Sequence, residues 1–174
     1  VIIAKTPEAE QLFLEVIKNR EVKKTYLCVT FGRPIPPDGT LGGYLLKDAD
    51  RGIVKIVPDK QPGAKDVETQ YETVAVSGRL ALLKVRLITG RTHQIRAHMQ
   101  AIGHPVAGDR KYGSEATNRK FREEYALSNQ FLHALRVEWK EQEGPLGYLY
   151  GKEMTAPLPK QLQEICDGLF GRAE

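Results

Sequence analysis

The segment Leu87–Gly113, LITGRTHQIRAHMQAIGHPVAGDRKYG, concentrates positive charge and hydrogen-bonding groups and holds three of the chain's four histidines. Arg91 and Arg96 each carry a planar guanidinium that can grip a phosphate or a carboxylate. A strand running into TGRTHQIR would deliver the backbone to a helix N-terminus, where free N–H groups favour an anion. Four neighbouring side chains could complete the site: Arg91, Thr92, His93 and Gln94. The segment therefore predicts an anionic ligand.

The surroundings of this segment are basic. Between Arg79 and Arg122 the only acidic residues are Asp109 and Glu115, whereas the whole chain is nearly balanced, with 26 lysines and arginines, 22 acidic residues and a net charge of +4. A local excess of positive charge is typical of proteins that bind a nucleic-acid backbone. Because the segment lacks the spaced glycines and the lysine of a P-loop, a nucleic acid is expected rather than a free nucleotide.

Several of these residues also have simpler structural explanations. His93, His98 and His104 resemble a metal set, but spacings of five and six residues do not place them on one helix face, so no metal site is expected. His98 lies on the apolar face of a predicted helix, which is typical of a hydrogen-bonded core histidine. His104 could serve only to shape a turn, and Arg91 could simply pair with Asp109.

Hydrophobic periodicity predicts the elements that position these residues. Apolar residues at helical spacing predict helices over residues 7–19, between Gly90 and Gly103, and from about 159 to 169. Alternating or β-rich runs predict strands at residues 1–5, 23–32, 41–46, 53–57, 67–88 (a hairpin turning at Ser77-Gly78), 131–139 and 150–156. Because strands outnumber helices and several neighbours are hairpin-linked, the predicted class is α+β with a largely antiparallel sheet.

Composition narrows the class of protein. A length of 174 residues and a hydrophobic content of 41% fit one globular domain. Cys28 and Cys166 lie far apart without metal spacing, so a reducing cytoplasm is expected rather than a secreted disulfide scaffold. No apolar run approaches the roughly 18 residues of a membrane span. We therefore expect a cytoplasmic domain with no membrane partner, and a monomer because no long exposed apolar stripe is evident.

The motifs resemble one family over nearly the whole chain. LITGRTHQIRAHMQAIGHPVAGDRKYG is similar to the signature of RluA-type RNA pseudouridine synthases, which isomerise uridine to pseudouridine. REVKKTYLCVTFG resembles the segment whose Lys-x-Tyr carries the active-site tyrosine, FLHALRVEW the strand that lines the pocket, and MTAPLP the closing segment. The resemblance implies a single α+β domain on a long, bent, mainly antiparallel sheet flanked by helices, with an RNA cleft crossing its middle.

The resemblance also implies roles for individual residues. Tyr26 would stack on a flipped uracil and help to remove the C5 proton late in the reaction. Arg96 would pair with the nucleophilic aspartate and lower its pKa. The remaining expected substrate contacts are Leu132 as an apolar floor, Lys23 and Lys24 as charges beside Tyr26, and Arg91, Thr92, His93 and Gln94 toward the RNA backbone or the aspartate loop. A strand tyrosine or leucine can also be plain core, and Arg96 could instead contact a phosphate.

The family's nucleophile has no counterpart in the sequence. It stands in a histidine-arginine-leucine-aspartate segment that ends in threonine-serine-glycine before a strand like VIIAK, whereas this sequence opens on VIIAK at Val1. We therefore expect residues 1–174 to be an N-terminally truncated catalytic domain, inactive in isolation, in which an acid such as Asp109 could pair with Arg96. Its partner would be ribosomal or transfer RNA, without cofactor or metal. The alternative is a non-catalytic RNA-binding module derived from such an enzyme.

Overall fold

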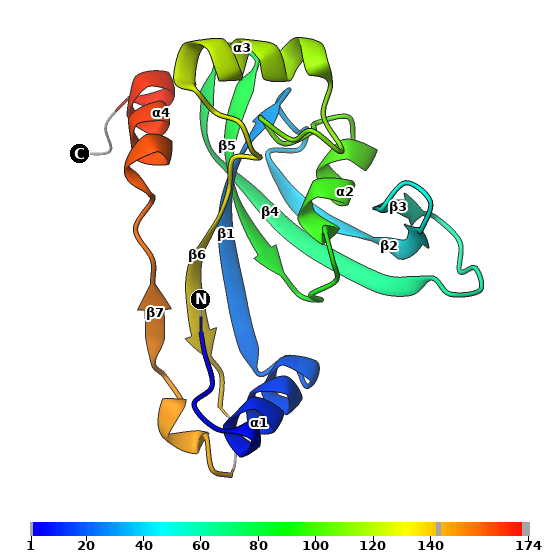
Figure 1. Ribbon diagram of the computed structural model, residues 1–174, viewed down its shortest axis with the longest axis vertical. Helices are drawn as coiled ribbons and strands as arrows, with labels where there is room; N and C mark the ends of the chain where they lie inside the picture. Colours follow the sequence, from blue (N-terminus) through cyan, green and yellow to red (C-terminus); the bar gives the residue numbers. More distant parts are fainter. Residues whose placement is uncertain (1, 142–143, 172–174) are drawn as a thin grey trace.

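A seven-stranded sheet forms the centre of the chain, of which the computed structural model describes residues 2–141 and 144–171 (Figure 1). Its strand order is β3-β2-β4-β5-β1-β6-β7, and each neighbouring pair is antiparallel. The strands are β1 (Val22–Phe31), β2 (Asp38–Asp48), β3 (Ile53–Val57), β4 (Lys65–Ser77), β5 (Leu80–Leu87), β6 (Leu132–Trp139) and β7 (Glu153–Thr155). The helices are α1 (Pro7–Lys18), α2 (Gln94–Ala101), α3 (Glu115–Tyr125), the short 3₁₀ turn η1 (Gly147–Leu149) and α4 (Lys160–Phe170). The predicted α+β class with an antiparallel sheet is confirmed.

Helices cover the sheet on both faces. α2 packs over β4, β5 and β1 around a core that includes Cys28, Leu83, Val85 and Met99. On the opposite face, α3 and α4 pack around Phe121, Phe131 and Ile165 at one end of the molecule (Figure 1). Because side chains alternate along a strand, residues of β1 with even numbers face α2 and those with odd numbers face away.

The other end of the sheet carries α1 (Figure 1). Thr6 caps this helix, its hydroxyl accepting a hydrogen bond from the N–H of Ala9 at 3.2 Å. Phe13 meets Trp139 edge to face with ring centroids 6.4 Å apart, and Val22 joins the same cluster. The apolar cluster that contains Val22 and Trp139, called the α1 cluster, begins at the start of β1. The core that contains Cys28 and Met99, called the α2 cluster, begins further along the strand. The stretch Lys24–Tyr26 lies between the two.

Two irregularities bend the sheet. In the pairing of β1 with β6, the register shifts between Thr25 and Tyr26, so that Leu135 of β6 is the extra residue. The pairing of β4 with β5 shifts between Thr73 and Ala75. Each bulge increases the local twist and bends its strand, which gives the bent sheet that the resemblance implied.

Three details differ from the elements predicted from sequence. The strand predicted at residues 1–5 is wrong where it is described: residues 2–4 form no regular structure, and Ile3 is 81% exposed because no neighbouring strand pairs with it. The hairpin turns at Gly78-Arg79 rather than Ser77-Gly78, with the left-handed φ of +54° on Gly78. The sequence reading also missed α3, a strongly polar helix capped by Ser114. Across the described residues, no helix is long and apolar enough to cross a membrane.

Candidate active site

Tyr26 lies on the α2 face of the sheet, in the stretch of β1 between the two helix-covered ends. Its neighbours across the sheet are Val85 of β5 and Ala134 of β6. The side chain is half-buried against the α2 core, and burial raises the pKa of its phenol. Leu132 packs against the same core and pairs with Cys28, the next β1 residue on this face. The structure therefore places Tyr26 and Leu132 on the same face of the sheet, packed against the same core.

The two lysines before Tyr26 point to opposite faces. Lys24 shares the face of Tyr26 and is half-buried, which lowers the pKa of its ammonium group. Lys24 also lies close to the loop Thr89–Arg91, which we call the TGR loop. A Cβ placed on Gly90 would lie only 2.8 Å from Lys24 Nζ. Lys23 faces the other way, with its Nζ 4.0 Å from Glu138. Of the two lysines expected beside Tyr26, the structure therefore places only Lys24 on the face of that tyrosine, because side chains alternate along the strand.

Gln94 holds the TGR loop in place. Its Oε1 accepts hydrogen bonds from the hydroxyl of Thr89 at 2.8 Å and the N–H of Arg91 at 3.0 Å. Its Nε2 donates to the carbonyl of Glu68 and the hydroxyl of Thr69, both at 2.9 Å. Because Gln94 is only 2% exposed and its amide is fully used, a direct RNA contact by this residue is not compatible with the structure.

The residues just before α2 are presented at the surface. Arg91 and Thr92 are exposed, and His93 is half-buried at the N-cap with a left-handed φ of +54°. The Nδ1 of His93 lies 3.1 Å from the hydroxyl of Tyr112. Burial, and then the nearby charges of Arg96 and Lys111, lower the pKa of His93. The imidazole is therefore neutral at pH 7, and the fixed positive charge of this loop comes from Arg91.

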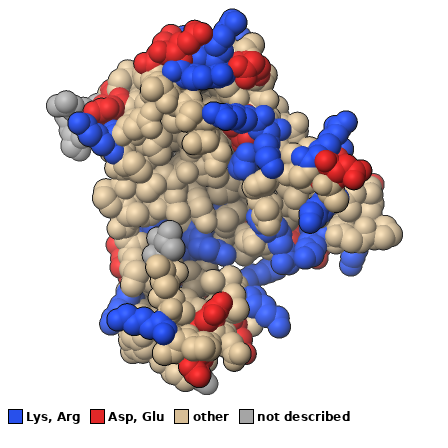
Figure 2. All heavy atoms as spheres, viewed as in Figure 1, with Lys and Arg blue, Asp and Glu red and all other residues tan. Residues whose placement is uncertain are grey.

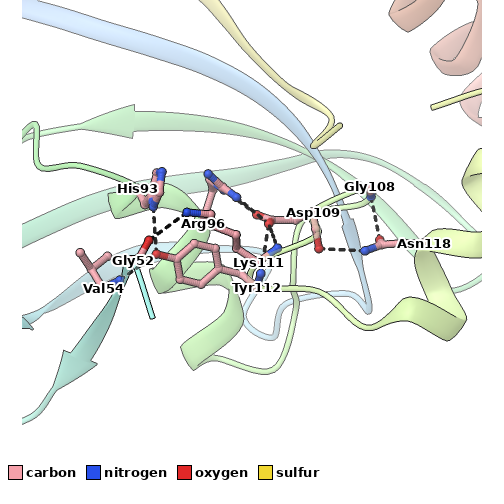
Figure 3. A network of polar contacts seen from close by, with 9 residues as sticks. All are labelled: Gly52, Val54, His93, Arg96, Gly108, Asp109, Lys111, Tyr112 and Asn118. Atoms are coloured by element: carbon pink, nitrogen blue, oxygen red, sulfur yellow. Dashed lines mark hydrogen bonds and ion pairs between the residues drawn. The ribbon is translucent and has the colours of Figure 1, made fainter. Parts of the chain in front are cut away.

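Arg96 lies in a buried ion pair with Asp109 (Figure 3). Its Nε donates to Oδ2 at 2.6 Å and its Nη2 to Oδ1 at 2.7 Å, a two-point contact. The guanidinium carbon lies 4.9 Å from the ring centroid of Tyr112. Asp109 thus takes the role of carboxylate partner expected for an acid near Arg96, and the alternative pairing of Asp109 with Arg91 is wrong.

The GDRKYG turn is built around Asp109. Burial acts to raise the pKa of this carboxyl, but hydrogen bonds from Arg96 and from the N–H groups of Tyr112 and Lys111 outweigh it and lower the pKa. The side-chain amide of Asn118 donates to the Asp109 carbonyl at 2.8 Å, and its Oδ1 accepts from the N–H of Gly108 at 3.0 Å. The sequence reading missed Tyr112 and Asn118. The signal for Tyr112 was present, since an aspartate often accepts N–H groups two and three residues on.

Two other histidines have structural positions. His98 is buried, with Nδ1 2.8 Å from the hydroxyl of Thr69, and burial lowers its pKa to about 4. This confirms the expected core histidine. His104 lies over Gly32, with Nδ1 3.3 Å from the carbonyl of Phe31. Among residues 2–141 and 144–171, no three histidine, cysteine or acidic side chains converge as metal ligands.

A hollow in the surface lies beside Thr89, the first residue of the TGR loop. A cavity of about 610 Å³ lies between Arg20, just after α1, and the Gly42–Tyr44 stretch of β2, and Thr89 also lines it. Figure 2 shows lysine and arginine side chains on both sides of the hollow between the end that carries α1 and the part that carries β2 and β3. Asp66 and Glu68 line the cavity as well, so its charge is mixed rather than uniformly positive.

Comparisons with known proteins agree on one family. Residues 1–101 match the family described as RNA pseudouridylate synthase. An uncharacterised RNA pseudouridine synthase of Chloroflexus aurantiacus is 35% identical over 179 residues, covering 99% of this chain and 50% of the relative. The dual-specificity RNA pseudouridine synthase RluA of Escherichia coli is 35% identical over 116 residues, covering 66% of this chain and 52% of the relative. The chain thus spans about half the length of the curated relatives it matches.

Solved structures support the same fold. Human RNA pseudouridylate synthase domain containing 4 superposes with a TM-score of 0.69 at 23% identity, covering 91% of this chain and 66% of the human one. Human RNA pseudouridylate synthase domain containing 1 gives a TM-score of 0.68 at 24% identity, with 90% and 62% covered. These structures show the same fold, and the sequence matches show that the chain belongs to the RNA pseudouridylate synthase family and is a domain of the RluA type.

Proposed function

We propose that this chain forms the RNA-binding and base-binding part of an enzyme that isomerises a uridine of ribosomal or transfer RNA. The observation that carries the proposal is the placement of Tyr26, Lys24 and Leu132 on one face of the sheet, between the α1 and α2 clusters and against the TGR loop. A half-buried aromatic ring beside unpaired positive charge suits a flipped base with its phosphate.

In this proposal each side chain has a distinct task. The ring of Tyr26 stacks on the uracil, and its hydroxyl group helps to remove the C5 proton late in the reaction. Leu132 forms the apolar floor. Arg91, Thr92 and Lys24 contact the RNA backbone through the loop surface. Arg96 orients the nucleophilic aspartate and keeps it ionised.

The reaction requires an aspartate nucleophile. Asp109 does not qualify, because it is fully buried and both of its oxygens bind Arg96. The resemblance puts the nucleophile in a histidine-arginine-leucine-aspartate segment, which the 174 residues do not contain. The isolated chain is therefore proposed to bind RNA without isomerising it. We further propose that the domain acts in the cytoplasm as a monomer, without metal or cofactor.

The test uses the full reading frame that encodes this chain. The purified protein is incubated with unmodified ribosomal and transfer RNA, and pseudouridine is measured by nuclease digestion and chromatography. The expected result is pseudouridine at a discrete position with the wild type and none with Tyr26→Phe. RNA binding with no pseudouridine formed in any substrate would overturn the enzymatic assignment and support the RNA-binding module.

A further inference from the structure

Arg96 still has unused hydrogen-bond donors. A guanidinium has five N–H groups, and the pair with Asp109 uses one on Nε and one on Nη2. Within the described part of the chain, no hydrogen bond reaches Nη1 of Arg96, although the Arg96 side chain is only 10% exposed. One edge of the guanidinium is therefore held, while the other remains available to a second carboxylate.

The held edge is fixed from two directions. Asp109 is anchored by the N–H groups of Lys111 and Tyr112 at 2.9 and 3.1 Å and is not exposed. Tyr112, below the guanidinium plane, is itself tied to β3, since its hydroxyl accepts from the N–H of Val54 at 2.9 Å (Figure 3). The guanidinium thus has a carboxylate along one edge and an aromatic ring on one face, and neither support can move without breaking the turn.

We propose that Asp109 is a positioning residue for the isomerisation, which sets the guanidinium of Arg96 so that its free Nη1 edge receives the carboxylate of the nucleophile. This inference rests on the proposed function. The bidentate pair removes the rotational freedom that a long arginine side chain otherwise has, so the nucleophile meets a preformed donor edge. A displaced donor edge would slow the chemical step and leave RNA binding, which uses other side chains, unchanged.

The structure provides a matched control for a merely structural role. Asn118 anchors the same turn through the Asp109 carbonyl and the Gly108 N–H, and it makes no hydrogen bond to Arg96. Asp109→Asn keeps the size of the side chain and removes one of its two acceptors for Arg96. Asn118→Ala loosens the turn and leaves the carboxylate of Asp109 in place.

The experiment measures kcat and KM of the full gene product on an RNA that the wild type modifies. Asp109→Asn is expected to lower kcat about 100-fold and to leave KM within about threefold, since a misplacement of about 1 Å has that effect. Asn118→Ala is expected to lower the melting temperature while kcat stays within about threefold of the wild type. Equal kcat for Asp109→Asn and the wild type, or an equal loss in both variants, would overturn the proposal.

A second variant covers the case in which Asp109→Asn does not fold. Tyr112→Leu removes the ring below the guanidinium and keeps the carboxylate, and it is expected to lower kcat at least about tenfold at unchanged KM. Unchanged kcat in this variant would also overturn the positioning role. A wild type that modifies no RNA defeats the proposed function itself, and the inference falls with it. An active wild type with an unaffected Asp109→Asn defeats only the inference.

Discussion

The Arg96 network and the Lys24–Tyr26 stretch lie on the same side of the sheet but are built in opposite ways. In the network, a buried cation meets a buried carboxylate at 2.6 and 2.7 Å, above an aromatic ring. In the stretch, a half-buried ammonium group has no ion pair within the described residues, and the phenol next to it is also half-buried. In the network the charge of Arg96 is already neutralised by a carboxylate, whereas in the stretch a half-buried charge remains for a ligand to neutralise.

The largest expected effect comes from breaking the ion pair of Arg96 with Asp109. Arg96→Ala leaves Asp109 buried without its partner, so the free energy of unfolding of this chain should fall by about 3–5 kcal/mol. In the full gene product the same change should abolish activity and leave RNA affinity within a few fold. Urea unfolding and an isomerisation assay measure the two effects. Arg91→Ala, at an exposed position, should change the free energy of unfolding by no more than about 0.5 kcal/mol. Equal losses of stability in Arg96→Ala and Arg91→Ala would contradict the expected difference between a buried ion pair and an exposed arginine.

Tyr26→Phe changes only the Lys24–Tyr26 stretch and leaves the Arg96 network intact. Removing one hydroxyl keeps the stacking surface, so RNA affinity and stability should stay near those of the wild type. The loss of a proton-transfer group should lower kcat on the order of 10²- to 10⁴-fold. Single-turnover kinetics at saturating enzyme separate this step from binding. Tyr44→Phe, in β2, is the control and should retain full activity. Wild-type kcat in Tyr26→Phe would remove Tyr26 from the chemistry.

His98 should make the free energy of unfolding of this chain fall at acid pH. Its pKa is lowered to about 4 in the fold, so the unfolded chain binds a proton that the native protein does not, and stability falls as pH drops from about 6.5 to 4. This group should account for up to about 3 kcal/mol of that loss, and the lowered pKa of His93 adds to it in the same direction. His98→Gln should flatten the dependence of urea unfolding on pH. An unchanged slope in His98→Gln would contradict this account.

The smallest expected effect is a difference between Lys24 and Lys23 in the salt dependence of RNA binding. RNA binding by this chain should weaken as salt rises, and Lys24→Ala should reduce the slope of log affinity against log salt by about one unit. Lys23→Ala should change it less, because Lys23 faces the opposite side of the sheet near Glu138. Filter binding over a salt series measures both. Salt-independent binding, or equal effects of the two variants, would count against the proposed contact between Lys24 and the RNA backbone.

The sequence was a good guide to the elements and to some of the site. Helical spacing placed His98 in the core, whereas Lys23 and Lys24 were predicted together beside Tyr26 although strand alternation puts them on opposite faces. The burial of Gln94 could not be predicted, because a polar residue at a helix start is usually exposed and its partners lie on β4, far away in the chain. The predicted first strand is not formed over residues 2–4 for a related reason, since a strand forms only where a neighbour pairs with it.

The bulge at Leu135 gives the domain a way to vary. Removing that one residue would let Ala134 and Arg136 continue an unbroken ladder opposite Tyr26 and Thr25, and every side chain of β6 would keep its face. The deletion would remove the hydrogen bond from the N–H of Ala156 to the Leu135 carbonyl, at 2.8 Å, and would change the twist between the end that carries α1 and the end that carries α2. A single-codon deletion at this site would therefore alter the angle between the two ends of the sheet on either side of Tyr26, and with it the shape of the proposed RNA site, with no substitution at any proposed contact residue.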